Sequence, residues 1–260
     1  MLNASGPTKG HVLRPSDGRI PKKAAFIQCV GSRVGKPKER YCSAVCCMLS
    51  VKEALIAQEH TPGLKTTIFF MDLRAFGKDF DEYYKRAESE YGVRFVMWRP
   101  SHLSENPATG ALKMVYETRD GKLAKEDFDL VILAAGIMPP AEARKLAQVM
   151  GIELNSYGFC RTDLFGPTET TRKGVYVAGA FAVPQDVPDS VAQSSAAAAK
   201  ATAGISEARG SLKVKLERPA ERETGGEPPR IGVFVCRCGI NIGGTVDVTA
   251  VVDEIGRAHV

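Results

Sequence analysis

The first part of the chain alternates short apolar runs with stretches in which apolar residues recur at helical spacing. Residues 22–30, KKAAFIQCV, form an apolar run with the length of a buried strand. Residues 43–58, SAVCCMLSVKEALIAQ, have the period of a helix, and Ser43 is a natural N-cap. The apolar face of this helix is expected to comprise Val45, Met48, Leu49, Leu55 and Ile56. The pattern predicts a strand, a loop and a helix, in that order.

The same alternation continues to about residue 138. Strands are predicted at 65–72, 93–98 and 127–136, a helix at 78–92, and a hairpin at Asp120 and Gly121. Strands that alternate with helices are typical of a parallel sheet covered by helices. The expected fold is a Rossmann-like α/β domain.

Composition supports a globular protein of one or two domains, because 44% of the 260 residues are apolar and 25% are charged. The longest apolar runs, such as residues 130–138, have about half the length needed to cross a bilayer. No signal-peptide pattern opens the chain. We therefore expect a cytoplasmic protein without a membrane span.

The positive charge is local. The net charge is +5, and residues 8–40 hold nine Lys or Arg against two acidic residues. Few aromatic residues accompany these charges and no basic recognition helix is evident, which argues against nucleic acid as a partner. Most of these charges suit a solvated loop, and a basic margin also suits an acidic protein partner or an anionic cofactor.

Four of the seven cysteines lie between residues 29 and 47. Cys29 ends the first predicted strand, Cys42 precedes the predicted helix, and Cys46 and Cys47 fall near its first turn. In a parallel sheet this turn normally carries a glycine-rich dinucleotide loop, yet no GxGxxG occurs in the chain. The four thiolates are expected to converge at the positive end of the helix dipole, which lowers thiol pKa.

Three interpretations of this cluster stay open from the residues alone. Structural zinc typically uses paired Cys-x-x-Cys knuckles, and the spacing C-x12-C-x3-C-C contains none. Inert thiols or a disulfide would require four cysteines to meet at one strand-helix junction by accident of packing. A four-thiolate iron-sulfur cluster fits the count, the anionic charge and a reducing compartment, and is favoured.

The cysteine motif also carries a family resemblance. AFIQCVGSR at 25–33, followed by YCSAVCCM at 41–48 and a helix, resembles the HdrA-like family, the iron-sulfur flavoproteins of CoB-CoM heterodisulfide reductase. Residues 1–18 and 174–199 match the same family, so the resemblance covers about 1–204. It implies that a [4Fe-4S] cluster is bound by Cys29, Cys42, Cys46 and Cys47.

The resemblance also implies a thioredoxin reductase-like fold in which an FAD domain is split around a second, nucleotide-domain-like module. Residues 1–22 are then a truncated segment of the FAD-domain region, 23–138 are the module with the cysteine motif, and 139–204 return to the FAD domain. Residues 205–229 are predicted to be a linker, 230–253 to begin a second HdrA-like N-terminal domain, and 254–260 are a possible sequencing-adapter artefact.

The remaining cysteines have weaker assignments. Cys236 and Cys238 are either ligands of a further cluster or two thiols on a strand, and both possibilities stay open. Cys160 stands alone in sequence and is expected to be a packing residue.

A flavin site is expected near the C-terminal end of the segment that resembles the family. Residues 174–180 predict a buried strand ending in glycine, and Pro188 opens an alanine-rich helix. The resemblance implies that FAD contacts Gly179, Ala180, Phe181, Ser190, Val191 and Ala192. Related reductases place an aspartate after the glycine, which this chain lacks, and the glycine-rich turn for the ADP moiety is also missing. The chain by itself is expected to bind FAD weakly.

The implied function is that of an electron-transferring protein that splits electron pairs on FAD and relays electrons through the [4Fe-4S] cluster. Its partners would be other heterodisulfide reductase-type subunits, with ferredoxin or a hydrogenase or dehydrogenase as electron partner. The alternatives are a non-catalytic zinc-binding structural module and an NAD(P)H-dependent thioredoxin reductase-like enzyme. The second alternative is disfavoured because GxGxxG and a redox-active Cys-x-x-Cys are both absent.

Overall fold

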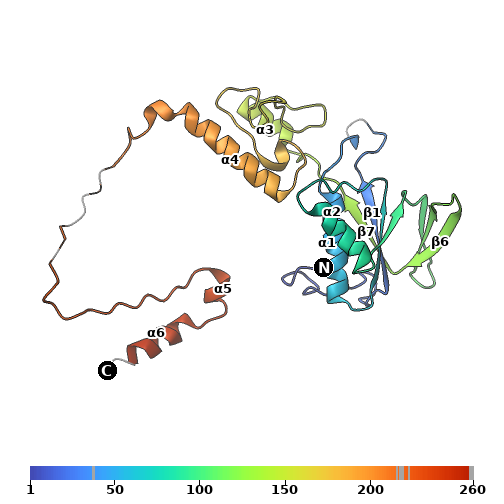
Figure 1. Cartoon of the computed structure of the whole chain (residues 1–260), viewed down its shortest axis with the longest axis horizontal. Coiled ribbons are helices and arrows are strands. Elements are labelled where there is room, and N and C mark those ends of the chain that lie inside the picture. The colour runs from blue at the N-terminus through green and yellow to red at the C-terminus, as the bar shows by residue number, and fades with distance from the viewer. Residues whose placement is uncertain (37–38, 215, 217–219, 222, 258–260) are drawn as a thin grey trace. The chain divides into compact units, whose positions relative to one another are not determined.

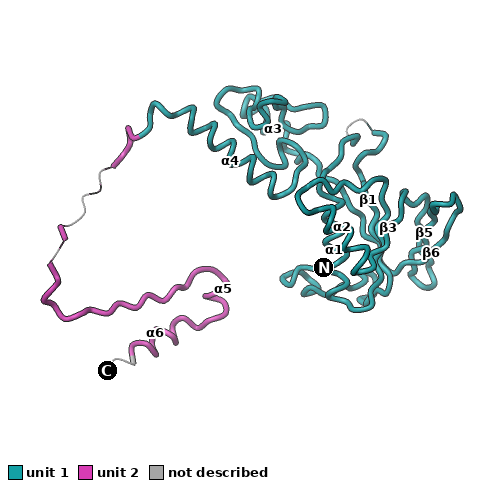
Figure 2. Tube along the Cα trace, in the orientation of Figure 1, with its two compact units in different colours: residues 1–209 teal, residues 210–260 magenta. Residues whose placement is uncertain are grey.

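The computed structural model describes residues 1–36, 39–214, 216, 220–221 and 223–257. These divide into two compact units, residues 1–209 and residues 210–260 (Figure 2). None of the described helices combines the length and apolarity needed to cross a membrane.

A parallel sheet forms the centre of the first unit (Figure 1). Its order is β3-β2-β1-β7, with bounds β1 Lys23–Val30, β2 Lys65–Phe70, β3 Arg94–Met97 and β7 Leu130–Ala135. Two helices, α1 Cys46–His60 and α2 Phe80–Ser89, connect β1 to β2 and β2 to β3. Every pair of neighbouring strands in this sheet is parallel, which confirms the predicted Rossmann-like α/β architecture.

Helix α1 packs on the sheet through a face that shares Leu55 with the predicted one but otherwise differs from it. Its Val51, Ala54 and Leu55 are buried against strands β1 and β2, whereas Leu49 is 51% exposed. The small Ala54 lets the helix approach the strands closely, so the larger Leu49 lies outside the contact. Ser43 is not the N-cap either, because Val45 occupies that position without a capping side chain.

A second, antiparallel sheet packs beside the first. Its order is β4-β5-β6, with bounds β4 His102–Glu105, β5 Leu112–Glu117 and β6 Leu123–Phe128. The hairpin predicted at Asp120 and Gly121 joins β5 to β6, and Gly121 has a φ of 77°, a left-handed conformation that favours glycine. The pattern of the sequence did not predict β4.

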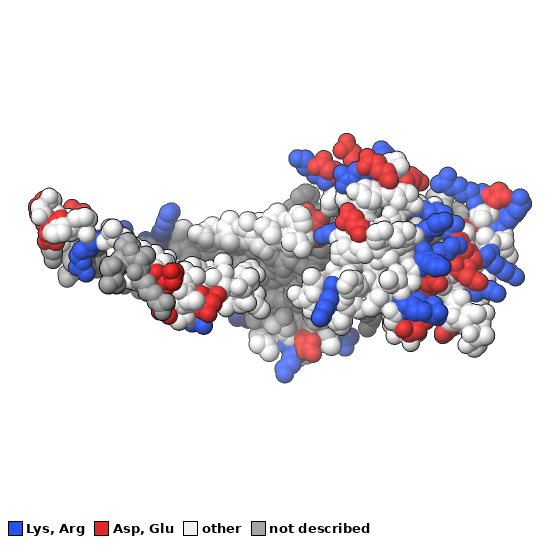
Figure 3. Space-filling model, turned by 90° about the horizontal axis from the view of Figure 1, so that it is seen from below, with Lys and Arg blue, Asp and Glu red and all other residues white. Residues whose placement is uncertain are grey.

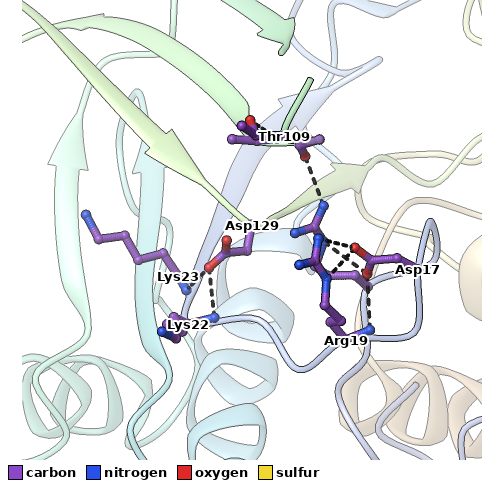
Figure 4. A network of polar contacts seen from close by, with 9 residues as sticks. Asp17, Arg19, Lys22, Lys23, Thr109 and Asp129 are labelled. Atoms are coloured by element: carbon purple, nitrogen blue, oxygen red, sulfur yellow. Dashed lines mark hydrogen bonds and ion pairs between the residues drawn. The ribbon is translucent and has the colours of Figure 1, made fainter. Parts of the chain in front are cut away.

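The segment before β1 is tied to the sheets by polar contacts (Figure 4). The carboxylate of Asp129, between β6 and β7, accepts hydrogen bonds from the backbone N–H groups of Lys22 and Lys23 at 2.8 and 2.9 Å. Arg14 donates to the carbonyl oxygen of Gly110 at 3.1 Å. These contacts join segments distant in sequence and fix where β1 enters the sheet.

The rest of the first unit contains α3 Ala143–Met150, the short 3-10 helices η2 Gly179–Phe181 and η3 Ser206–Ala208, and α4 Val187–Gly204. The start of α4 confirms the prediction, and its N-cap Asp186 accepts a hydrogen bond from the N–H of Asp189 at 2.9 Å. The prediction of a strand at 174–180 is wrong. Tyr176 makes one isolated bridge, to Glu169, and the chain then turns at Gly179, so no ladder extends there.

The second unit is short of regular structure. Its described residues form α5 Gly239–Gly243 and α6 Val248–Arg257, and those at 230–238 form no strand. Residues 215, 217–219 and 222 of the predicted linker, and 258–260 of the suspected adapter segment, lie outside the described residues.

Where charged residues appear on the face drawn in Figure 3, both signs are interspersed. Five basic residues of the segment 8–40 pair with acids: Arg14 and Arg19 with Asp17, Lys23 with Glu126, Arg33 with Asp72, and Lys36 with Glu39. The local excess of positive charge is therefore partly neutralised.

Phe69 joins the two sheets, and its replacement should be costly. Its ring lies 4.9 Å from that of Tyr116 and 5.9 Å from that of Phe128, centroid to centroid, and it is fully buried. We expect Phe69→Ala to lower the free energy of unfolding by about 3–5 kcal/mol in urea titrations followed by circular dichroism. Phe165→Ala is the control, because that ring is 95% exposed, and should change it by less than about 0.5 kcal/mol. Equal losses in both variants would refute this view of the core.

Candidate functional site

The four clustered cysteines lie at the carboxyl edge of the parallel sheet. Cys29 is next to last in β1, Cys42 lies in the following loop, and Cys46 and Cys47 open α1. The pairing of β1 with β7 shifts register between Ile27 and Val30, so the strand is irregular at Cys29. The predicted placement of these cysteines around the strand-helix turn is confirmed.

The backbone around the cysteines is strained. Six non-glycine residues in the described chain have positive φ, and three of them are Cys29, Arg33 and Ala44, at 59°, 56° and 61°. Each left-handed non-glycine residue costs about 1–3 kcal/mol and persists where its surroundings enforce it. Such strain tends to collect at functional sites, which points to this turn.

A buried pair of serines holds the turn in place. The Oγ atoms of Ser32 and Ser43 lie 2.7 Å apart, and Ser43 accepts a hydrogen bond from the N–H of Ile137 at 2.9 Å. A side chain at Gly136 would collide with both hydroxyls. Both ends of the cysteine loop are therefore fastened to the residues that follow β7. Sequence reasoning missed this role because Ser43 also has the character of an N-cap.

Burial is the largest influence on the pKa values of three clustered thiols in the metal-free protein. It raises the pKa of Cys29 and Cys46, and that of Cys47 to about 11. The expectation that the helix dipole would lower these values is wrong, because desolvation of a buried thiolate outweighs the dipole. After burial, the charges of Cys29 and Cys42 raise the pKa of Cys46 further, so these thiols are electrostatic neighbours.

Basic side chains line the same turn. Asp72, just after β2, pairs with both Arg33 and Arg74, and its hydrogen bond from Arg33 holds the pKa of its carboxyl below the usual value. Arg33 also opposes the rise in the pKa of Cys29. An Arg-rich margin stabilises an anionic centre made of thiolates.

The donor set fits an iron-sulfur cluster or zinc, although the thiols do not stand in coordinating geometry. All seven cysteines are free, and the described residues include no metal-binding group of three or more His, Cys, Asp or Glu. Gln28, beside Cys29, is fully buried, and neither polar atom of its amide has a hydrogen-bond partner. Such an orphan costs about 1–3 kcal/mol and calls for a group that satisfies it. The ligand assignment stays a prediction.

A pocket of about 830 Å³ adjoins the cysteine loop. Ala44, Val45 and Met48 line one side, and Ala180 and Ser190 belong to the other, near the start of α4. The pocket therefore links the turn that carries the thiols with the segment predicted to contact a flavin.

The predicted flavin residues are dispersed around this pocket. Ala180 and Ser190 line it, whereas Val191 and Ala192 are exposed on α4. Two are already engaged by the protein, since the N–H of Gly179 donates to Gln193 at 2.7 Å and the carbonyl oxygen of Phe181 accepts from the N–H of Cys160 at 2.9 Å.

Gln193 was missed by sequence reasoning. Its side-chain oxygen accepts a second hydrogen bond, from Gln185 at 2.7 Å, so it fixes the loop before α4. In the sequence, the feature that could have indicated this role is a single glutamine in a helix that otherwise consists mostly of small residues.

The other cysteines differ from the cluster. Cys160 is 1% exposed and packs with Val177 and Ala182, which confirms it as a packing residue. Cys236 and Cys238 are exposed, with Sγ atoms 2.8 Å apart, and hydrogen bonding between the two residues lowers the pKa of Cys236. Whether they are ligands stays a prediction.

Comparison with known proteins places the chain in a redox family. Residues 57–201 match the pyridine nucleotide-disulphide oxidoreductase family. The chain belongs to this family. The match begins after the last clustered cysteine at residue 47, so the cysteine turn of this chain lies outside the matched range.

Curated relatives of this chain confirm the resemblance to the HdrA-like proteins of heterodisulfide reductase. An H(2):CoB-CoM heterodisulfide,ferredoxin reductase subunit of Methanothermobacter thermautotrophicus is 45% identical over 206 residues, which are 77% of this chain and 31% of the relative. A CoB–CoM heterodisulfide reductase iron-sulfur subunit of Methanocaldococcus jannaschii is 40% identical over 221 residues, 84% of this chain and 33% of the relative. The chain thus spans about a third of the length of these relatives.

Among solved structures, LpdA from Mycobacterium tuberculosis is similar with a TM-score of 0.45 and 17% identity, over 78% of this chain and 38% of that one.

The two groups of thiols should differ in reactivity in the metal-free protein. At pH 8 we expect iodoacetamide to alkylate Cys236 well before Cys47, as followed by peptide mass spectrometry. Because the pKa of Cys47 is raised to about 11, its thiolate fraction and labelling rate should grow about tenfold per pH unit from pH 8 to 10. Cys47→Ser identifies the labelled peptide, and equal rates for the two thiols at pH 8 would contradict the prediction.

Proposed function

We propose that this chain belongs to an electron-transferring iron-sulfur flavoprotein of a heterodisulfide reductase-type complex. The observation that carries the proposal is the placement of four cysteines at the strand-helix turn where a dinucleotide loop normally lies. The Methanocaldococcus jannaschii relative is named an iron-sulfur subunit, which supports the proposal. When bound, FAD would exchange and split electron pairs, and a [4Fe-4S] cluster would exchange single electrons.

The four ligands would have different structural roles. Cys29 would anchor the cluster to β1, and Cys42 would contribute from the loop fastened by the serine pair. Cys46 and Cys47 are adjacent in α1, so their side chains diverge by about 100° and can meet one cluster only against the first helical turn. The basic margin around Asp72 would balance the negative charge of the thiolates.

The flavin would be held at the pocket between the cysteine loop and α4. Two carboxylates, Asp186 and Asp189, stand at the start of α4 and disfavour a phosphate there. The pocket lining is mostly apolar, with Ala180 and Ser190 beside it, so we propose that the uncharged ring system lies there. Gln193 would hold the turn at Gly179 in the conformation that binds the flavin, through its hydrogen bond from the N–H of Gly179.

Partners and location are part of the same proposal. Other heterodisulfide reductase-type subunits, together with ferredoxin or a hydrogenase or dehydrogenase, would exchange electrons with this protein, and the overall reaction would act on a sulfur group. A reducing cytoplasm suits the seven free thiols. In this proposal the nucleotide-domain-like module with the cysteine motif comprises residues 23–138, and the FAD domain comprises residues 1–22 and 139–204.

Anaerobic reconstitution tests the cluster directly. We expect the wild-type chain to bind four irons with matching acid-labile sulfide, and the variant with Ser at positions 29, 42, 46 and 47 to bind none. Cys160→Ser is the control and should keep the full iron content, because the side chain of Cys160 packs with Val177 and Ala182. One zinc without iron or sulfide would favour the structural zinc module, and an intact cluster in the fourfold variant would refute the ligand assignment.

Single substitutions should separate anchoring from coordination. We expect Cys47→Ser to leave a three-iron or labile cluster with the fold intact, whereas Cys29→Ser should also lower the melting temperature by loosening the junction of β1 and α1. Anaerobic calorimetry with iron content recorded measures both. Equal stability losses in the two variants would contradict the anchoring role of Cys29.

A further inference from the structure

Gln28 is the most unusual buried residue near the cysteines. Its side chain is 0% exposed, and both the Nε2 and Oε1 atoms lack a hydrogen-bond partner within the described part of the chain. Only one other buried side-chain atom among the described residues shares this state, Nε of Arg14. A fully buried amide with neither atom satisfied is rare in folded proteins, so this one needs an explanation.

Strand geometry gives the surroundings of Gln28. Successive side chains of a strand point to opposite faces. Ala25 and Ile27 pack toward the antiparallel sheet, while Phe26 packs against Val51 of α1. The pairing of β1 with β7 is regular through Ile27, and Gln28 follows directly. By this alternation, Gln28 shares the face of Phe26 and lies one step closer to the carboxyl edge.

The same geometry places Gln28 opposite the first turn of α1. Two strand residues rise by about 6.6 Å, which matches about four residues of a helix. Helix α1 connects the parallel strands β1 and β2 and therefore runs back along β1. Four residues before Val51 is Cys47, and Cys29 adjoins Gln28 in sequence. The orphan amide thus lies near two of the proposed cluster ligands, Cys29 and Cys47.

A trapped water is a weaker explanation. A buried water needs two to four polar partners, and apart from Ser50 the buried residues of α1 are apolar residues and thiols. Sulfur in a thiolate or sulfide accepts hydrogen bonds, and such bonds help to set the potential of iron-sulfur clusters.

We propose that the Nε2 group of Gln28 donates a hydrogen bond to a sulfur of the cluster held by the four cysteines, and thereby raises its midpoint potential. The inference rests on the proposed function. A donor aimed at sulfur stabilises the more negative, reduced state of the cluster. Gln28 is a positioning residue. Its Nε2 group has no hydrogen-bond partner in the metal-free protein and would donate to a cluster sulfur in the loaded protein.

The test compares Gln28→Met with the matched control Gln58→Met. Gln58 is also a glutamine of this layer, but its Nε2 group donates to Oγ1 of Thr66 at 2.7 Å. Each variant of the 260-residue chain is purified anaerobically and measured in two states. Thermal unfolding is recorded for the metal-free form, and a redox titration followed by electron paramagnetic resonance gives the midpoint potential of the loaded form.

The two glutamines should behave in opposite ways. Gln28→Met should raise the melting temperature of the metal-free chain by about 2–4 °C, because it removes an unsatisfied amide, and should lower the midpoint potential of the loaded chain. Gln58→Met should lower the melting temperature and leave the potential unchanged.

Gln28→Glu serves as a second variant if the methionine variant does not fold, and its carboxylate should lower the potential as well. If every folded variant at position 28 binds a cluster with the same midpoint potential as the wild-type chain, this inference is overturned and the proposed function is not. A wild-type chain that takes up no iron under reconstitution would overturn the proposed function and this inference with it, and the iron content is therefore measured first.

Discussion

Burial of the turn between β1 and α1 is the constraint on which the rest of the structure depends. Four cysteines lie along that turn at the carboxyl edge of a parallel sheet, in a backbone that is left-handed at Cys29 and Ala44. The buried hydroxyls of Ser32 and Ser43 hold this conformation against the end of β7. Without that fastening the strained turn would relax, and the raised pKa of Cys47, which results from its burial, would return toward its ordinary value.

The same turn forms one wall of the neighbouring pocket. Ala44 and Met48 belong to it, and the start of α4 supplies the opposite wall. Any ligand in the pocket would therefore lie close to the thiols, which is the arrangement that electron exchange between two redox groups requires. The fold of an oxidoreductase family is kept, while the turn that would hold a dinucleotide carries cysteines.

Much of the fold followed from the pattern of the sequence. The parallel strands, the hairpin at Gly121, the start of α4 and the position of the cysteines around one turn were predicted, because each depends on local periodicity or turn chemistry. The face of α1 was predicted only in part: Leu55 is buried as expected, but Ala54, whose small side chain carries a weak hydrophobic signal, and Val51 complete the contact in place of Leu49.

The features that define the site were not accessible from the sequence. The strand expected at 174–180 fails because a strand requires a partner, and pairing is set by tertiary structure. The Ser32–Ser43 pair, the contacts of Gln193 and the orphan amide of Gln28 likewise depend on residues distant in the chain or on burial. The balance between helix dipole and desolvation at the thiols also depends on burial that periodicity does not reveal.

Anomalous diffraction from crystals of the anaerobically loaded chain, collected at the iron and zinc absorption edges, tests the central claim most directly. The account predicts iron peaks from a single cluster between the end of β1 and the first turn of α1, within bonding distance of Cys29, Cys42, Cys46 and Cys47. A zinc peak at that turn, or iron located only elsewhere in the chain, would contradict it.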